Sequence, residues 1–100
     1  MVPKVVFRPR AEKDLLDSYE FIAADNPAAA MEFIRRLRQF AHGLEDMPER
    51  GMQREDFASG VRILVFERRV TIAYRVVNDR VQILRLFYAG RNTPSAFLGN

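Results

Sequence analysis

The chain has 100 residues, of which 48% are hydrophobic and 29% charged, and it contains no cysteine. A chain of this length is typical of one compact domain, which we expect to span residues 1–100. The lack of cysteine excludes disulfides, thiolate metal sites and cysteine nucleophiles. No apolar run approaches the roughly 18 residues needed to cross a membrane, and the N-terminus becomes charged too early for a secretory signal. We therefore expect a cytoplasmic protein with no membrane partner.

The positive charge is concentrated in the second half of the chain. Residues 1–50 carry a net charge of −1 and residues 51–100 carry +4, for a total of +3. Fourteen of the 16 basic residues are arginine, whose planar fork of donors suits carboxylates and phosphates. The second half is therefore expected to face an acidic protein segment or a nucleic-acid backbone. A solvated surface without a partner is the alternative interpretation of the same composition.

The first half of the chain predicts a strand followed by two helices. Residues 4–8 are typical of a short strand, and from residue 10 to 24 apolar side chains recur at helical spacing. Asn26 and Pro27 are typical of the N-cap and first turn of a second helix, which we expect to run from 27 to about 45. Because the connection is so short, the two helices are expected to form an antiparallel hairpin.

The second half predicts a loop followed by three strands. Residues 46–60 show no sustained period and are expected to form a long loop. Strands are predicted at 61–67, 70–76 and 81–88, and the third is apolar on both faces, which is typical of a central strand. The order of elements predicts an α+β fold in which the helical hairpin packs on one face of a mainly antiparallel sheet.

Motifs spread over almost the whole chain occur together, in this order, in one known family. They are Phe7-Arg8-Pro9-Arg10-Ala11-x-x-Asp14-Leu15; Tyr19-x-x-Ile22-Ala23-x-x-Asn26-Pro27-x-Ala29-Ala30; Phe33, Leu37, Leu44, Pro48, Gly51 and Arg54; Gly60-Val61-Arg62; Ile72-Ala73-Tyr74-Arg75-Val76; and Ile83-Leu84-Arg85-Leu86-Phe87-Tyr88. Each motif taken alone is a packing or turn requirement. Their combination resembles the ParE branch of the RelE/ParE toxins.

This resemblance implies the toxin of a bacterial type II toxin–antitoxin pair with a RelE/ParE-like fold. ParE-type toxins are associated with inhibition of DNA gyrase, whereas RelE-type relatives cleave messenger RNA on the ribosome. Both are neutralised by a cognate antitoxin, here expected to be ParD-like, whose C-terminal segment wraps the toxin. The antitoxin supplies the DNA-binding part when the pair represses its own operon, so operator DNA is expected to be bound only through the antitoxin. No cofactor is implied.

The end of the chain departs from the family pattern. ParE-like members often carry His where this chain has Tyr88, in a His-x-x-Arg-Asp-like stretch that here is Tyr88-Ala89-Gly90-Arg91-Asn92. A tyrosine near this position also occurs in the ribonuclease branch. We favour inhibition of DNA gyrase by binding, without chemistry of the toxin's own. A RelE-like, ribosome-dependent mRNA endonuclease is the alternative.

The two functions require different sets of residues. For binding to the target we predict Arg85, Tyr88 and Arg91. An endonuclease requires a base for the ribose 2′-OH, a proton donor and cations that stabilise the phosphorane, and its candidates are Tyr88, Arg85, Arg91, Arg62 and Arg54. None of these is a ready base near neutral pH, because the ordinary pKa of tyrosine is about 10.

Antitoxin binding is predicted for Arg62, Arg75, Phe21 and Ile34. Phe21 and Ile34 fall off the main apolar stripes of the predicted helices, so they can line a groove for an amphipathic segment. A metal site is not expected, because the sequence holds one histidine, His42, and no cysteine.

Arg85 interrupts an apolar strand, where strand alternation places it on the side of Val81, Ile83 and Phe87. A charge in such a place must be paired or reach solvent. One alternative is a structural salt bridge with Glu67 or another carboxylate. The other is a contact with a carboxylate of the antitoxin or target.

Overall fold

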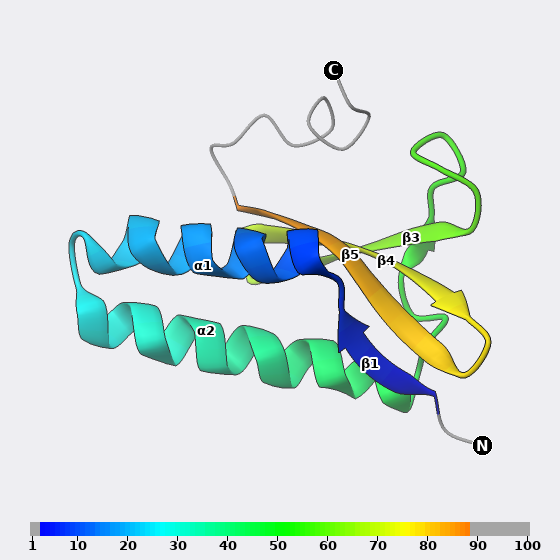
Figure 1. Cartoon of the computed structure of the whole chain (residues 1–100), viewed down its shortest axis with the longest axis horizontal. Helices are drawn as coiled ribbons and strands as arrows, with labels where there is room; N and C mark the ends of the chain where they lie inside the picture. Colours follow the sequence, from blue (N-terminus) through cyan, green and yellow to red (C-terminus); the bar gives the residue numbers. More distant parts are fainter. Residues whose placement is uncertain (1–2, 89–100) are drawn as a thin grey trace.

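The computed structural model describes residues 3–88 and has two layers, a helical hairpin and a sheet (Figure 1). In chain order the elements are β1 (Lys4–Phe7), α1 (Pro9–Ala23), α2 (Pro27–His42), the 3₁₀ helix η1 (Gly43–Glu45), β2 (Met52–Gln53), β3 (Val61–Phe66), β4 (Val70–Val77) and β5 (Arg80–Tyr88). The predicted α+β fold is confirmed. No helix within the described residues is long and apolar enough to cross a lipid bilayer.

The sheet has five strands in the order β1-β5-β4-β3-β2. Strand β1 runs parallel to β5, and the other neighbouring strands are antiparallel. The third predicted strand, β5, is an interior strand, because it lies between β1 and β4, while β4 is the central strand of the five. Strand β2 lies in the segment expected to be a loop, where Met52 pairs with Ile63 and Gln53 with Arg62. Two residues are too few to produce a recognisable alternation, so the pattern could not reveal this strand.

Local signals explain where the helices begin and end. The Arg8 N–H donates to the Ile83 carbonyl at 2.9 Å, and α1 then begins at Pro9. At the start of α2 the Asn26 side chain accepts a hydrogen bond from the Ala29 N–H at 3.1 Å, which confirms the predicted N-cap. The α-helix ends at His42 rather than near residue 45, because the chain tightens there into η1.

Apolar clusters lie on both faces of the sheet. The larger joins the helices to the sheet around Phe33, Leu37 and Tyr74, and burying a side chain of this size stabilises a fold by roughly 1.5–3 kcal/mol. Because successive strand residues point to opposite faces, Ala73 belongs to the face away from the helices. The smaller cluster on that face consists of Val61, Ala73 and Phe87, with Phe57, Ile63 and Leu84 packed against it.

An irregularity in β5 changes the face on which Arg85 lies. Ala73 pairs with Arg85, but the next residue, Tyr74, pairs with Ile83, so Leu84 is an extra residue in the ladder. Such a bulge shifts the alternation of the strand by one residue. The expectation that Arg85 shares a side with Val81 and Ile83 is therefore wrong, because those two side chains belong to the helix-facing cluster.

Candidate functional site

Arg85 forms a salt bridge with Asp14 of α1. Its Nε lies 2.8 Å from Oδ2 and its Nη2 lies 3.3 Å from Oδ1. The two side chains are 17% and 12% exposed, and the guanidinium carbon lies 4.8 Å from the centre of the Phe87 ring. The structural alternative for Arg85 is confirmed with a different partner, because Glu67 instead pairs with Arg36 at 2.8 Å.

Asp14 also completes the hydrogen bonding of β5 beyond the end of β1. Strand β1 ends at Phe7, and farther along β5 the Asp14 carboxylate accepts a hydrogen bond from the Leu86 N–H at 2.9 Å. A side chain of α1 thus replaces a missing strand partner. The sequence motif contained Asp14 but gave no signal for these contacts, which join residues 71 and 72 positions apart.

Tyr88 lies against the helices rather than beside Arg85. Its ring makes an edge contact with Phe33 at a centroid distance of 5.9 Å and a tilted contact with Phe21 at 5.6 Å. Tyr88 therefore packs on the helix-facing cluster, whereas Arg85 pairs with Ala73 of the opposite one. The third predicted target-binding residue, Arg91, lies outside the described residues.

The other two arginines of the proposed endonuclease set contact residues 46–60. The Arg62 Nη1 donates to the carbonyls of Glu49 and Gly51 at 3.1 and 2.8 Å. Arg54 forms a forked pair with Asp56 at 2.9 and 2.8 Å. The hydrogen bond from Arg54 lowers the pKa of the Asp56 carboxyl below its ordinary value. Both guanidinium groups therefore form hydrogen bonds with residues of this segment.

Residues predicted to bind the antitoxin lie in two places. Phe21 is 62% exposed on α1. Ile34 lines a groove of about 390 Å³ between the helices, together with Glu12, Leu15, Leu16, Tyr19 and Arg38. Arg75 lies on β4, where its Nη1 donates to the Ser59 carbonyl at 3.4 Å and its buried Nε has no partner within residues 3–88.

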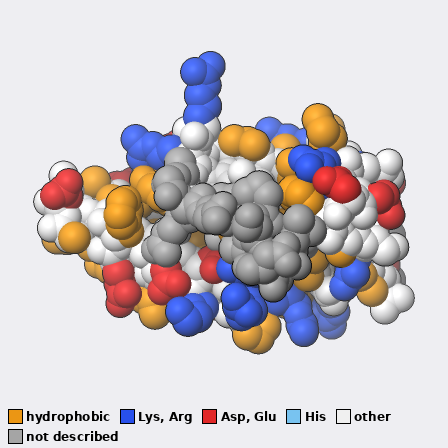
Figure 2. All heavy atoms as spheres, turned by 90° about the horizontal axis from the view of Figure 1, so that it is seen from above, with side chains coloured by type: hydrophobic (Ala, Val, Ile, Leu, Met, Phe, Trp, Pro, Cys, Tyr) orange, Lys and Arg blue, Asp and Glu red, His pale blue; other side chains and the backbone are white. Residues whose placement is uncertain are grey.

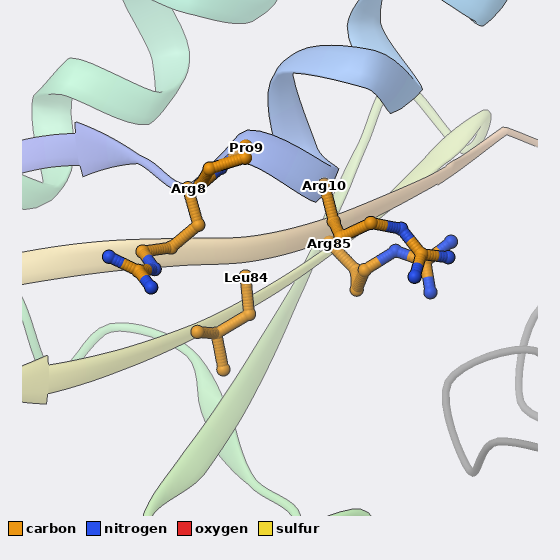
Figure 3. Close-up of a pocket in the computed structure, with 5 residues that line it drawn as sticks. All are labelled: Arg8, Pro9, Arg10, Leu84 and Arg85. Atoms are coloured by element: carbon orange, nitrogen blue, oxygen red, sulfur yellow. The ribbon is translucent and has the colours of Figure 1, made fainter.

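A second pocket, of about 430 Å³, lies where α1 begins. Its lining residues are Arg8, Pro9, Arg10, Leu84 and Arg85. In Figure 3 the guanidinium groups of Arg10 and Arg85 lie at one end and that of Arg8 at the other, with Leu84 between them. Arg8 and Arg10 belong to one of the family motifs but were not among the predicted site residues. The available signal was their place at the predicted start of a helix, where basic residues are unfavourable.

Charge and apolar side chains are mixed on the surface. On the face shown in Figure 2, Lys and Arg side chains lie along both long sides, and hydrophobic side chains are scattered among them. Within residues 3–88, no three His, Asp or Glu side chains lie together in a way that could hold a metal ion.

The family model described as the ParE toxin of the parDE type II toxin–antitoxin system matches residues 5–93. A solved structure of the chromosomal ParDE system from P. aeruginosa has a similar fold, with a TM-score of 0.75. It is 24% identical in sequence, and the match covers 87% of this chain and 96% of that one. No curated protein sequence matches the chain.

Proposed function

Because the chain belongs to the ParE toxin family of type II toxin–antitoxin systems, we propose that it inhibits DNA gyrase by binding. It acts in the cytoplasm and is neutralised by a ParD-like antitoxin. Operator DNA is bound only through that antitoxin. Arg85, Tyr88 and Arg91 are the residues proposed to contact the target.

The observation that favours binding over RNA cleavage is the separation of the endonuclease candidates. Tyr88 packs against Phe21 and Phe33 of the helices, the Arg85 guanidinium is paired with Asp14, and Arg54 and Arg62 hold the segment 46–60. An endonuclease needs its base, acid and cations around one phosphate. The described candidates do not surround one such space, so this arrangement supports a toxin that acts by contact.

The proposed function is tested by adding the purified chain to DNA gyrase and relaxed plasmid and measuring supercoiling. Inhibition is expected, and DNA synthesis should stop before protein synthesis when the chain is induced alone in bacteria. If protein synthesis stops first and messenger RNA is cleaved, the endonuclease alternative replaces gyrase inhibition.

The groove beside Ile34 supports the proposed antitoxin contact. Leu16 lines the groove and exposes 55% of its surface, so an amphipathic segment can bury apolar area there. Phe21, which is 62% exposed elsewhere on α1, is the second proposed apolar contact. Arg62 and Arg75 are the proposed polar contacts on the sheet. With an antitoxin co-expressed, Leu16→Glu is expected to weaken the complex, because it places a charge in the apolar groove.

Met52→Glu is the matched control for this experiment. Met52 is 68% exposed on β2, outside the groove, and the substitution makes the same change from an apolar to an acidic side chain. Equal complex formation by both variants would contradict the groove as the antitoxin site.

A further inference from the structure

Three arginines line the pocket at the start of α1 (Figure 3), and two of them have no counter-charge among the described residues. Arg8 and Arg10 are exposed, and within residues 3–88 neither forms a salt bridge or a side-chain hydrogen bond. Arg85 is paired with Asp14. The group thus carries a surplus of positive charge around a space of about 430 Å³, which can accept an anionic group.

The positions of Arg8 and Arg10 are unfavourable for the helix that they begin. Arg8 is the N-cap of α1 and makes no side-chain capping bond, although Ser, Thr, Asp and Asn are the residues that stabilise this position. Arg10 lies in the first turn, where the helix dipole favours acidic side chains. Residues that are unfavourable for the local structure in which they lie commonly mark functional sites. A role in binding rather than in folding therefore explains why arginine occupies these two positions.

The lining of the pocket favours a protein ligand over a nucleic acid. Leu84 is half-buried between the arginines, and like Ile63 and Phe57 it packs against the smaller apolar cluster of the sheet. Arg54, which lies over the Phe57 ring, is already neutralised by Asp56. Binding to a phosphate backbone strengthens with the number of phosphates that cations neutralise, whereas this mixed surface suits an acidic segment that also presents apolar side chains.

We propose that the pocket lined by Arg8, Arg10 and Arg85 anchors an acidic segment of the target protein. This inference rests on the proposed inhibition of gyrase and specifies its contact. The pocket shares no lining residue with the groove proposed for the antitoxin. Substitutions of Arg8 and Arg10 are therefore expected to weaken target binding while leaving antitoxin binding intact.

The variants Arg10→Glu and Arg8→Asp test the proposal without threatening the fold. Each places an acidic residue where the N-terminus of a helix favours one, so the melting temperature is expected to stay the same or rise. Inhibition of gyrase supercoiling is expected to weaken roughly tenfold or more for each variant, because a contact between opposite charges becomes a repulsion. Arg80→Glu is the control, since it makes the same charge change at the exposed start of β5.

A second measurement separates failure of this inference from failure of the proposed function. Binding of a fluorescent hexaglutamate peptide is measured without gyrase, and Arg10→Glu and Arg8→Asp are expected to abolish it, unlike Arg80→Glu. Unchanged peptide binding and unchanged gyrase inhibition in both variants would overturn the proposed pocket. If the wild-type chain binds the peptide through these residues yet leaves gyrase unaffected, gyrase is the wrong target and the acidic-ligand site remains.

Binding of a labelled DNA duplex tests whether the pocket binds nucleic-acid phosphates instead of an acidic protein segment. The wild-type chain is expected to bind it no better than the Arg10→Glu variant does. Tight duplex binding that is lost in Arg10→Glu and falls steeply with salt would identify a nucleic-acid phosphate as the ligand, and would overturn the assignment to an acidic protein segment.

Discussion

Asp14 binds Arg85 through two contacts, of 2.8 and 3.3 Å, and so joins α1 to strand β5 of the sheet. The same carboxylate accepts the Leu86 N–H at 2.9 Å. One side chain therefore neutralises a largely buried cation and satisfies a backbone donor beyond the end of β1. It also fixes the position of a guanidinium group that lines the pocket at the start of α1.

Asp14→Ala is expected to destabilise the fold by about 3 kcal/mol, because it leaves a largely buried arginine and a strand N–H without their acceptor. Asp14→Asn should be less damaging, since the amide oxygen can still accept from Leu86. Urea unfolding monitored by circular dichroism measures both. Asp17→Ala is the control, because the exposed Asp17–Lys13 pair contributes less than about 1 kcal/mol. Equal losses for Asp14→Ala and Asp17→Ala would contradict this account.

Tyr74 is the polar centre of the helix-facing cluster. Its fully buried hydroxyl accepts from the Gly51 N–H at 2.7 Å and donates to the Pro48 carbonyl at 2.9 Å. Tyr74→Phe is expected to reduce the free energy of unfolding by about 2 kcal/mol, because a buried N–H loses its partner. Hydrogen exchange at the Gly51 amide should also accelerate. Tyr19→Phe on the half-exposed face of α1 is the control, and an equal effect there would refute the assigned role.

Gly51 is required by close packing against the same tyrosine. A Cβ at this position would lie 2.7 Å from the Ile63 carbonyl oxygen and 2.7 Å from two atoms of the Tyr74 ring and hydroxyl. Gly51→Ala is therefore expected to destabilise the fold by about 1–3 kcal/mol, as overpacking does. Gly43→Ala provides the comparison, because nothing lies within 4 Å of a Cβ there. Thermal unfolding should show a loss for Gly51→Ala and none for Gly43→Ala.

The parts of the fold that were predictable depend on short-range signals. Helical periodicity and the Asn26 cap act within one or two turns, so they placed α1 and α2 correctly to within a few residues. The bulge at Leu84 arises from the pairing of two strands, and simple alternation cannot reveal it. One extra residue was enough to move Arg85 to the other face.

The candidate site was less predictable because its contacts join distant parts of the chain. The charge of Arg85 required a partner, but the choice of Asp14 over Glu67 depends on where β1 stops and α1 begins. Arg8 and Arg10 resembled ordinary surface residues until the fold placed them around a pocket with Arg85. The residues of the pocket come from the two ends of the described chain, so no local pattern connects them.

Glu45 makes the stability of the fold depend on pH at the outer edge of β1. Its carboxylate accepts the Val5 N–H at 3.0 Å, and this hydrogen bond holds the pKa of Glu45 below its ordinary value of 4.5. Because the folded pKa is lower than the unfolded one, the contribution is complete above the unfolded value and is lost as the pH falls through the folded value.

Glu45→Gln is therefore expected to flatten the fall in melting temperature between about pH 5 and about pH 3, because the glutamine does not titrate while its amide oxygen can still accept from Val5. The exposed Glu49 provides the matched variant Glu49→Gln, which should follow the wild-type curve. Differential scanning calorimetry across this range measures the slope. If Glu45→Gln loses stability with acid as steeply as the wild type, the Val5 contact does not control the acid response.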